Sequence, residues 1–310
     1  GCLVDGLDYI LGAMEQGCRS VSLEKPVDYS QDDMTCVLVK DGTIALAAMA
    51  SAFFDHPSRK IDLVGITGTN GKTTTATLLH DLYSSIRHKC GLISTVTNKV
   101  GDRSIKSTHT TPNPVSLNSL LNEMVNEGCT HCFMEVSSHA VVQNRIHGVQ
   151  FKGGVFTNIS HDHLDYHKTF DAYIKAKKKF FDDLSRDAFA LVNIDDKNGS
   201  VMLHNTLAQK YNFALKTPAD FKAKIIENDI SGLILNMDGK EFYSRLIGRF
   251  NAYNLLTVFA TATLLGEDKL TILSALSNLS SVDGRFQYVK GQKGPTAIVD
   301  YAHTPDALEN

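Results

Sequence analysis

A glycine-rich segment followed by lysine and threonines carries the strongest chemical signal in the sequence. Residues 65–80 read GITGTNGKTTTATLLH, and Gly71-Lys72-Thr73 resembles the end of a phosphate-binding loop. The strict pattern has a glycine at the position of Ile66. Gly68 and Gly71 can still adopt positive φ and let the backbone approach an anion closely. Lys72 supplies a charge and Thr73 a hydroxyl for magnesium, so the segment predicts a phosphate-binding loop.

A second acid is needed if that loop is to hold magnesium together with phosphate. The apolar segment HCFMEV, residues 131–136, predicts a buried strand that ends near Glu135. Ligand groups in parallel sheets gather at the carboxyl ends of strands. We therefore expect Glu135 to bind the metal directly or through water.

Histidines gather in the segment HDHLDYH, residues 161–167. His161, His163, Asp165 and His167 nearly match the H-x-H-x-D-H spacing of a two-zinc hydrolase, except that Tyr166 stands where the final histidine belongs. The phosphate loop upstream disfavours the zinc interpretation. Magnesium rarely takes imidazole ligands, so a histidine on a magnesium ion would be unusual.

A run of lysines follows, at positions 175, 177, 178 and 179 in AYIKAKKKFFDDL. Such a run is typical of a solvated helix face. Alternatively, one lysine points inward. A lysine near a metal loses its charge more easily than an arginine does, and a neutral amine can take up carbon dioxide to become a carbamate, which is an anionic metal ligand.

These residues must be positioned by an alternation of strands and helices. A continuous apolar run predicts a strand buried on both faces at 61–66, and further strands are predicted at 131–136, 153–158, 188–193 and 296–301. Apolar spacing predicts helices after the loop and at 114–127, 170–184 and 253–265. This pattern predicts an α/β fold with a mostly parallel sheet and flanking helices. Residues 221–250 alternate like antiparallel strands, so a mixed sheet is possible. The N-terminal part predicts helices at 7–16 and 43–54, strands near 21 and at 36–39, and a boundary at His56-Pro57.

Composition limits the class of protein. The net charge is -3 and 43% of the residues are hydrophobic, so no global basic field favours nucleic acid or membrane as a partner. No apolar run approaches the length of a membrane span, and six cysteines are sparse for a disulfide scaffold. We expect a reduced, cytoplasmic enzyme. Cys129 and Cys132 could form a redox motif or half a metal site, but small core residues are the simpler interpretation.

Eight ordered blocks resemble one known family, the Mur ligases of peptidoglycan synthesis. They are GITGTNGKTTT, STHTTPNP, MEVSSHAVVQNRI, FTNISHDHLDYH, AKKKFF, GRFNAYNLL, DGRFQ and VDYAHTPDAL. The resemblance runs from residue 1 to residue 310, and the absence of the first loop glycine is normal for this family.

The resemblance implies a role for individual residues. It assigns catalytic roles to Lys72, Glu135, His163, Lys177 and Arg285. Two Mg²⁺ ions are implied, with Thr73 and Glu135 on the first and with His163 and a carbamate on Lys177 on the second. The implied ATP contacts are Gly68, Thr69, Asn70, Gly71, Lys72, Thr73, Thr74, Asn254 and Asp300. The implied contacts to the UDP-linked substrate are Thr110, Thr111, Ser137, Gln143 and Arg145, and residues 1–6 resemble a turn at the uridine end.

The implied reaction is ATP-dependent amide-bond formation through an acyl phosphate. The central blocks resemble the members that add the third amino acid to UDP-N-acetylmuramoyl-dipeptide, with meso-diaminopimelate as the expected acceptor and L-lysine as the alternative. We expect a monomer. The rival class is a P-loop ATP-binding module or kinase, which would not need the TTPNP and SSHAVVQNR segments.

The resemblance also implies three domains. Residues 1–57 would be part of an N-terminal UDP-sugar-binding domain, residues 58–290 a central ATP-binding domain, and residues 291–310 the start of a C-terminal domain that binds the amino acid. We therefore expect the 310-residue polypeptide by itself to bind ATP without forming the amide.

Overall fold

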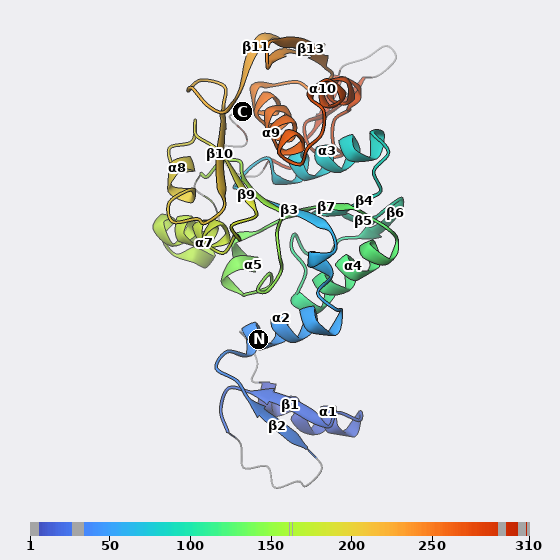
Figure 1. The fold of residues 1–310 in the computed structure, drawn as a ribbon, viewed down its shortest axis with the longest axis vertical. Helices are drawn as coiled ribbons and strands as arrows, with labels where there is room; N and C mark the ends of the chain where they lie inside the picture. Colours follow the sequence, from blue (N-terminus) through green and yellow to red (C-terminus); the bar gives the residue numbers. More distant parts are fainter. Residues whose placement is uncertain are drawn as a thin grey trace.

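The structure is a computed structural model, and it describes residues 6–26, 34–160, 162, 164–290, 296–302 and 308. Figure 1 shows a central sheet between two layers of helices, with a small N-terminal unit beyond one layer.

The strands and helices have the following bounds. The strands are β1 Ser20–Leu23, β2 Thr35–Leu38, β3 Asp62–Thr67, β4 Cys90–Ile93, β5 Thr97–Val100, β6 Arg103–Lys106, β7 His131–Glu135, β8 Gly153–Phe156, β9 Phe189–Asn193, β10 Gln209–Ala214, β11 Phe221–Asp229, β12 Gly232–Met237, β13 Lys240–Ser244, β14 Gln287–Lys290 and β15 Thr296–Val299. The α-helices are α1 Ile10–Glu15, α2 Gly42–Phe53, α3 Lys72–Ser85, α4 Pro114–Asn126, α5 Ser138–Val142, α6 Leu164–His167, α7 Phe170–Asp182, α8 Gly199–Met202, α9 Arg249–Leu264 and α10 Lys269–Asn278, and two short 3-10 helices are Gly6–Tyr9 and Pro57–Arg59.

The main sheet is mixed, as the sequence suggested. Among the described residues it has eleven strands in the order β13-β12-β11-β10-β9-β8-β3-β7-β4-β5-β6. The strands from β11 to β4 pair in parallel, whereas the pairs beyond them at both edges are antiparallel. The predicted mostly parallel α/β fold is therefore confirmed, and the antiparallel alternation within 221–250 belongs to β11, β12 and β13.

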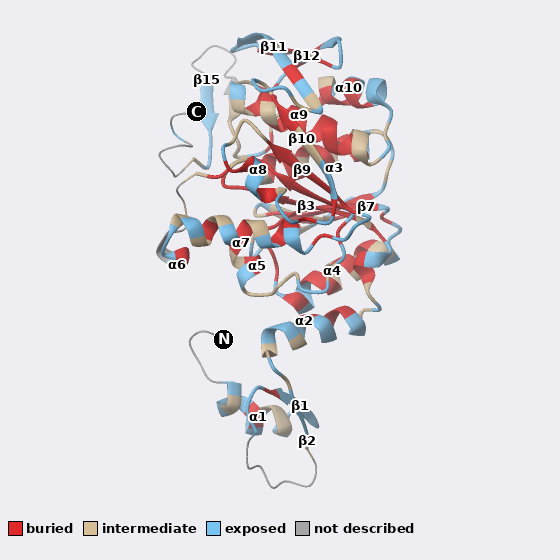
Figure 2. Cartoon of the chain, turned by 60° about the vertical axis from the view of Figure 1, so that its left-hand side comes forward, coloured by how far each residue is buried: buried red, intermediate tan, exposed pale blue. Residues whose placement is uncertain are grey.

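Helices cover both faces of this sheet, and its central strands are therefore buried on both faces. Five of the six residues of β3 are fully covered. Apolar residues of α3, α9 and α10 form one core cluster, and those of α4 and α7 form the other. Figure 2 shows the buried residues concentrated in the sheet and in the helix faces toward it. This packing brings the carboxyl ends of β3, β7, β8 and β9 to one edge.

The N-terminal unit is smaller. β1 and β2 form a parallel two-stranded sheet, and α2 leads toward the body and packs against α4. Asp41 caps α2 by accepting bonds from the amides of Thr43 and Ile44. After α2 the chain turns sharply at His56, which has a φ of 49°, near the boundary expected from the sequence.

One predicted strand lies in a different sheet. The segment 296–301 contains β15, but this strand pairs antiparallel with β14 in a separate two-stranded sheet and not with the parallel strands. The interpretation of Cys129 and Cys132 as core residues is confirmed, since both are buried and neither forms a disulfide. Burial raises the pKa of both thiols. None of the helices in the described ranges is both long and apolar enough to span a membrane.

Candidate active site

The predicted phosphate loop joins β3 to α3. Gly68 has a φ of 153° and Gly71 a φ of 85°, which a side chain would strain. A Cβ on Gly68 would lie 1.9 Å from the Thr157 hydroxyl oxygen, and one on Gly71 would lie 2.7 Å from the Asn254 amide oxygen. Both glycines are therefore required by close packing as well as by conformation. The first amide groups of α3 have no partner within the helix and favour an anion.

The chain after β8 holds this loop in place. Asn158 accepts a hydrogen bond from the Asn70 amide at 2.9 Å and donates one to the Asn70 carbonyl at 3.0 Å. Thr157 also donates to that carbonyl, at 2.7 Å. The loop is thus fixed to a neighbouring strand end without using the backbone amides at the start of α3.

Two lysines meet at the carbonyl oxygen of Gly68. Lys72 Nζ donates to it at 2.9 Å and also donates to the Thr69 carbonyl at 2.7 Å. Lys177 Nζ donates to the same Gly68 oxygen at 2.8 Å. Burial lowers the pKa of Lys72, with Glu135 and Asp162 acting in the opposite direction. Burial and the neighbouring Lys72 hold the pKa of Lys177 well below its usual range.

Lys177 is the inward lysine of the run on α7. It is 1% exposed, whereas Lys175 and Lys179 are exposed and pair with Asp171 and Asp183. The inner face of α7 also carries Tyr173, whose ring lies 4.6 Å from Lys177 Nζ and whose hydroxyl lies 3.2 Å from the Thr69 hydroxyl. The hypothesis of one inward-pointing lysine is confirmed in its geometry.

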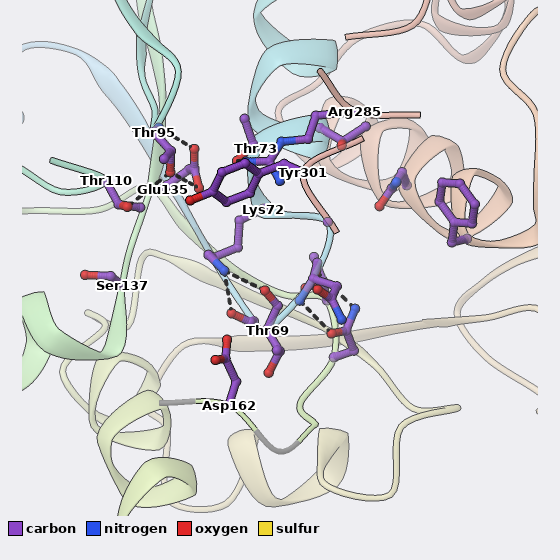
Figure 3. Close-up of a pocket in the computed structure, with 18 of the residues that line it drawn as sticks. Thr69, Lys72, Thr73, Thr95, Thr110, Glu135, Ser137, Asp162, Arg285 and Tyr301 are labelled. Carbon is purple, nitrogen blue, oxygen red and sulfur yellow. Dashed lines mark hydrogen bonds between the residues drawn. The ribbon is translucent and has the colours of Figure 1, made fainter. Parts of the chain in front are cut away.

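Glu135 lies at the end of β7, fully buried. One carboxylate oxygen accepts the Thr95 amide at 2.7 Å and the other accepts the Thr95 hydroxyl at 3.2 Å. That hydroxyl lies 3.1 Å from the hydroxyl of Thr110. Figure 3 shows Glu135, Thr95, Thr110 and Ser137 on one side of Lys72.

Arg285 reaches the phosphate loop from the far end of the chain. Its guanidinium donates to the Thr73 hydroxyl at 3.1 Å, and it stacks 4.8 Å from the Tyr301 ring centre. Next to Tyr301, Asp300 accepts the amides of Phe286 and Ala302. Asn254, on α9, accepts from the Thr75 hydroxyl at 3.5 Å. These contacts bring Arg285, Asp300 and Asn254 from three later parts of the chain to the region of the phosphate loop.

The residues expected to contact the UDP-linked substrate lie around the start of α5. Thr111 donates to the Glu135 carbonyl at 2.9 Å and accepts the Ser137 amide at 3.1 Å. Arg145 donates to the Thr111 carbonyl at 2.8 Å. Gln143 does not line the cavity described below; instead it accepts two bonds from the Arg145 guanidinium, at 2.9 and 2.6 Å. Gln143 is thus placed to orient Arg145.

α6 is tied to this substrate-side segment. His167 Nε2 lies 2.8 Å from the Ser138 hydroxyl, and Gln143 donates to the Tyr166 hydroxyl at 3.2 Å. The Nε2 atom of His167 is therefore engaged with serine, which does not suit a zinc ligand. His161 and His163 lie outside the described residues, as does the 1–5 part of the segment expected at the uridine end.

All the described site residues except Gln143 face one cavity of about 1060 Å³. It is lined by the loop residues 68–74, Glu135 and Lys177, by Thr110, Thr111, Ser137 and Arg145, and by Asn254, Arg285 and Asp300. Its wall carries both cationic and acidic side chains. The cavity is large enough for a nucleotide and part of a second substrate.

Several lining residues were not anticipated from the sequence. They are Thr95, Asn158, Asp162, Tyr173, Asp195, Asp196, Lys216, Arg249, Phe250, Tyr253 and Thr257. One signal could have found two of them, because Asp195 and Asp196 follow the buried strand 189–193, and polar residues after a parallel strand gather at the ligand edge.

The donors at the cavity suit magnesium. The hydroxyl of Thr73 and the carboxylate of Glu135 are hard oxygen donors. Within the part of the chain that the structure describes, no group of three or more His, Cys, Asp or Glu side chains could hold a metal ion. A cation held by Thr73 and Glu135 would complete its coordination with water and with the phosphates of a ligand, which is how magnesium is commonly bound.

The fold is that of an α/β protein with a mostly parallel sheet. Its glycine-containing loop and the charged side chains around it suit a ligand that carries several phosphates. The model of the Mur ligase middle domain matches residues 66–262. The chain therefore belongs to the Mur ligase family.

Similar proteins agree with this assignment. The chain is 55% identical over 311 residues to the UDP-N-acetylmuramoyl-L-alanyl-D-glutamate–2,6-diaminopimelate ligase of Cytophaga hutchinsonii, which covers 100% of this chain and 64% of that protein. The ligase of the same name from Bacillus cereus is 38% identical, covering 100% of this chain and 65% of its own length. The chain thus spans less than two thirds of these relatives.

Solved structures show the same fold. A structure of a ligase of that name superposes with a TM-score of 0.82 at 26% identity and covers 97% of this chain and 62% of its own. A MurF ligase from Thermotoga maritima, solved in complex with ADP, superposes with a TM-score of 0.69 at 21% identity, covering 100% and 68%. At that identity the second likeness concerns the fold alone.

Proposed function

We propose that the protein acts in ATP-dependent formation of an amide bond, joining meso-diaminopimelate to UDP-N-acetylmuramoyl-L-alanyl-D-glutamate. The observation that carries the proposal is the convergence of Lys72, Glu135 and Lys177 on one cavity beside the phosphate loop. The names of the relatives support diaminopimelate over L-lysine as the acceptor.

The chemistry requires activation of a carboxylate, because hydroxide is a poor leaving group. The substrate carboxylate attacks the γ-phosphorus of ATP, which releases ADP and forms an acyl phosphate. The amine then attacks the acyl carbon, and the tetrahedral intermediate expels phosphate as the amide forms. Both steps concentrate negative charge, so fixed cations and helix amides at the reacting groups lower the barrier.

The residues divide this work by position. The loop 68–74 and Lys72 would hold the β- and γ-phosphates, and Arg285 would neutralise charge from the other side. Arg145, Thr110 and Ser137 would bind the UDP-linked substrate, with Gln143 orienting Arg145. Asn254 and Asp300 would contact the nucleoside. The short contacts between Glu135 and Thr95 support a carboxylate held in one orientation for a ligand.

Magnesium would be held by Thr73 and Glu135 in one site, and by His163 and a carbamate on Lys177 in the other. When bound, the ions neutralise phosphate charge and polarise the transferred group. Burial and the adjacent Lys72 favour the neutral amine of Lys177. This amine attacks the carbon of carbon dioxide, and the N–C bond forms with loss of one proton. The remaining N–H can still donate to the Gly68 carbonyl.

The test is product formation by the full-length protein that carries these residues. It is incubated with ATP, Mg²⁺ and UDP-N-acetylmuramoyl-dipeptide, and with meso-diaminopimelate or L-lysine in parallel. We expect mass spectrometry to detect the diaminopimelate product in preference to the lysine product. Preferential lysine incorporation would overturn the acceptor assignment, and phosphoryl transfer without amide product would favour a kinase.

A further inference from the structure

Two adjacent aspartates that have no role in the mechanism above line the cavity. Asp195 and Asp196 follow β9 at the same sheet edge as the phosphate loop. Acids in a site for an anionic ligand would repel it unless their charge is used elsewhere. The hydrogen bonds of each aspartate are therefore informative.

Asp195 is saturated by donors of the protein itself. One oxygen accepts the amides of Leu215 and Lys216 at 2.8 and 2.9 Å and the Tyr253 hydroxyl at 2.8 Å. The other accepts the amide and the hydroxyl of Thr217, at 2.9 and 2.7 Å. A carboxylate offers about four lone-pair positions, so these five donors leave no capacity for a ligand.

These donors join two elements at one end of the cavity. Residues 215–217 form the connection after β10, and Tyr253 lies on α9 beside Asn254. Lys216, Tyr253, Asn254 and Phe250 line the cavity there. Asp195 thus holds the turn 215–217 at a fixed distance from Tyr253 on α9. Backbone groups on one side and aromatic side chains on the other are suited to bind a nucleoside.

Asp196 binds a different part of the chain. It accepts the Ile159 amide at 2.8 Å with one oxygen and the Asn198 amide at 2.8 Å with the other. Ile159 directly follows Asn158, the residue that pairs with both backbone groups of Asn70 in the phosphate loop. Asp196 therefore supports the loop through one intermediate residue.

We propose that Asp195 and Asp196 are positioning residues that set the two ends of the nucleotide pocket separately, Asp195 the nucleoside end and Asp196 the phosphate end. This proposal rests on the proposed binding of ATP. Neither residue contacts the ligand, and each acts through the segment that it holds.

The experiment compares a ligand with a nucleoside and one without, using calorimetry with ADP and with tripolyphosphate on the chain. We expect Asp195→Asn to weaken ADP binding about tenfold while tripolyphosphate binding stays unchanged. Tyr253→Phe, which removes one donor and keeps the ring, should do the same to a smaller extent. Asp196→Asn should weaken both ligands by the same factor.

Matched controls lie outside the cavity, with Tyr211 on β10 and Asp220 just before β11. Asp220 accepts the Asn212 amide at 2.9 Å, and Tyr211 donates to the Gln209 side chain at 3.2 Å. Asp220→Asn and Tyr211→Phe should change neither affinity. If the unsubstituted chain binds both ligands but Asp195→Asn and Tyr253→Phe weaken them equally or not at all, the proposal is overturned while ATP binding stands. If the unsubstituted chain binds neither ligand, the proposed function itself fails, and this proposal fails with it.

Discussion

Lys72 and Lys177 donate hydrogen bonds to one acceptor, the carbonyl oxygen of Gly68, at 2.9 and 2.8 Å. Two ammonium groups at one oxygen repel each other, and burial makes the repulsion stronger. The pKa of both lysines is lowered, mainly by burial, and that of Lys177 lies well below its usual range. Burial and the close approach of the two groups therefore disfavour charge on both lysines at once, and they do so more strongly at Lys177.

Replacing Lys72 should weaken nucleotide binding without loss of stability. We expect Lys72→Ala to weaken ADP binding by about tenfold or more, because a positive charge is lost from the loop. The melting temperature should not fall, since the Lys72 ammonium group contacts carbonyl oxygens and, among the described residues, forms no ion pair. Calorimetry and thermal denaturation measure both quantities. Lys175→Ala, on an exposed lysine, is the control, and unchanged ADP affinity in Lys72→Ala would contradict the loop assignment.

Lys177 should carry a carbamate in the presence of bicarbonate. We expect a carbamate carbon signal in NMR spectra of the protein with labelled bicarbonate, Mg²⁺ and ADP. The signal should vanish in Lys177→Met and persist in Lys179→Met, because Lys179 is exposed and paired with Asp183. Persistence of the signal in Lys177→Met would exclude this residue as its source.

Glu135 should control the magnesium dependence of nucleotide binding. Glu135→Gln keeps an oxygen for the Thr95 amide but loses the charge that attracts a cation. We expect Mg²⁺ to strengthen ADP binding in the unsubstituted chain and to have little effect in this variant, as measured by calorimetry with and without the metal. Glu123→Gln, on an exposed partner of Arg103, should behave like the unsubstituted chain. Equal Mg²⁺ dependence in all three proteins would remove Glu135 from the metal site.

The contacts of α6 with Ser138 and Gln143 should affect the binding of the UDP-linked substrate but not that of the nucleotide. Tyr166→Phe removes the acceptor of the Gln143 amide, and His167→Phe removes the partner of the Ser138 hydroxyl. We expect each to weaken binding of UDP-N-acetylmuramoyl-dipeptide about fivefold with ADP affinity unchanged. Tyr243→Phe, whose hydroxyl bonds to the exposed turn at Ser231, is the control. A parallel loss of ADP affinity would indicate general unfolding of the site.

Protonation of the buried His131 should lower the free energy of unfolding in mild acid relative to neutral pH. Burial lowers the pKa of His131 below the ordinary 6.5, with Asp62 opposing and His88 adding to the shift. The unfolded chain therefore binds a proton at a higher pH than the folded one. The stability is complete above pH 6.5 and is lost as the pH falls toward the folded pKa. His131→Phe, which keeps ring packing on Tyr83, should flatten this dependence in thermal denaturation. His147→Asn should not, and an unchanged slope in His131→Phe would refute the prediction.

Local patterns were sufficient to predict the strand, loop and helix around Lys72, whereas the lysine run left a solvated face and one inward lysine both open, and only the family resemblance selected Lys177. Strand, loop and helix follow one another directly at residues 62–85. Lys177 follows Tyr173 by one helical turn on the apolar face of α7, and this spacing is consistent with its burial.

Other features depend on contacts between distant residues. The bonds of Asn158 to the loop span 88 residues, and the Asp195–Tyr253 bond spans 58. The segment 296–301 was correctly predicted to contain a strand, but β15 is exposed and pairs outside the main sheet. An apolar run indicates an extended segment but does not record which neighbour it pairs with or what covers it.

The hydrogen bonds between Asn70 and Asn158 determine when the site can form during synthesis of the chain. During synthesis the loop sequence leaves the ribosome while residues 157–160, which hold both backbone groups of Asn70 and the amide of Thr69, are still untranslated. β3 likewise has its neighbour β7 once residue 135 has been added but has both neighbours, β7 and β8, only once residue 156 has been added. A nascent chain that ends between residues 75 and 156 contains every residue of the phosphate loop but neither Thr157 nor Asn158.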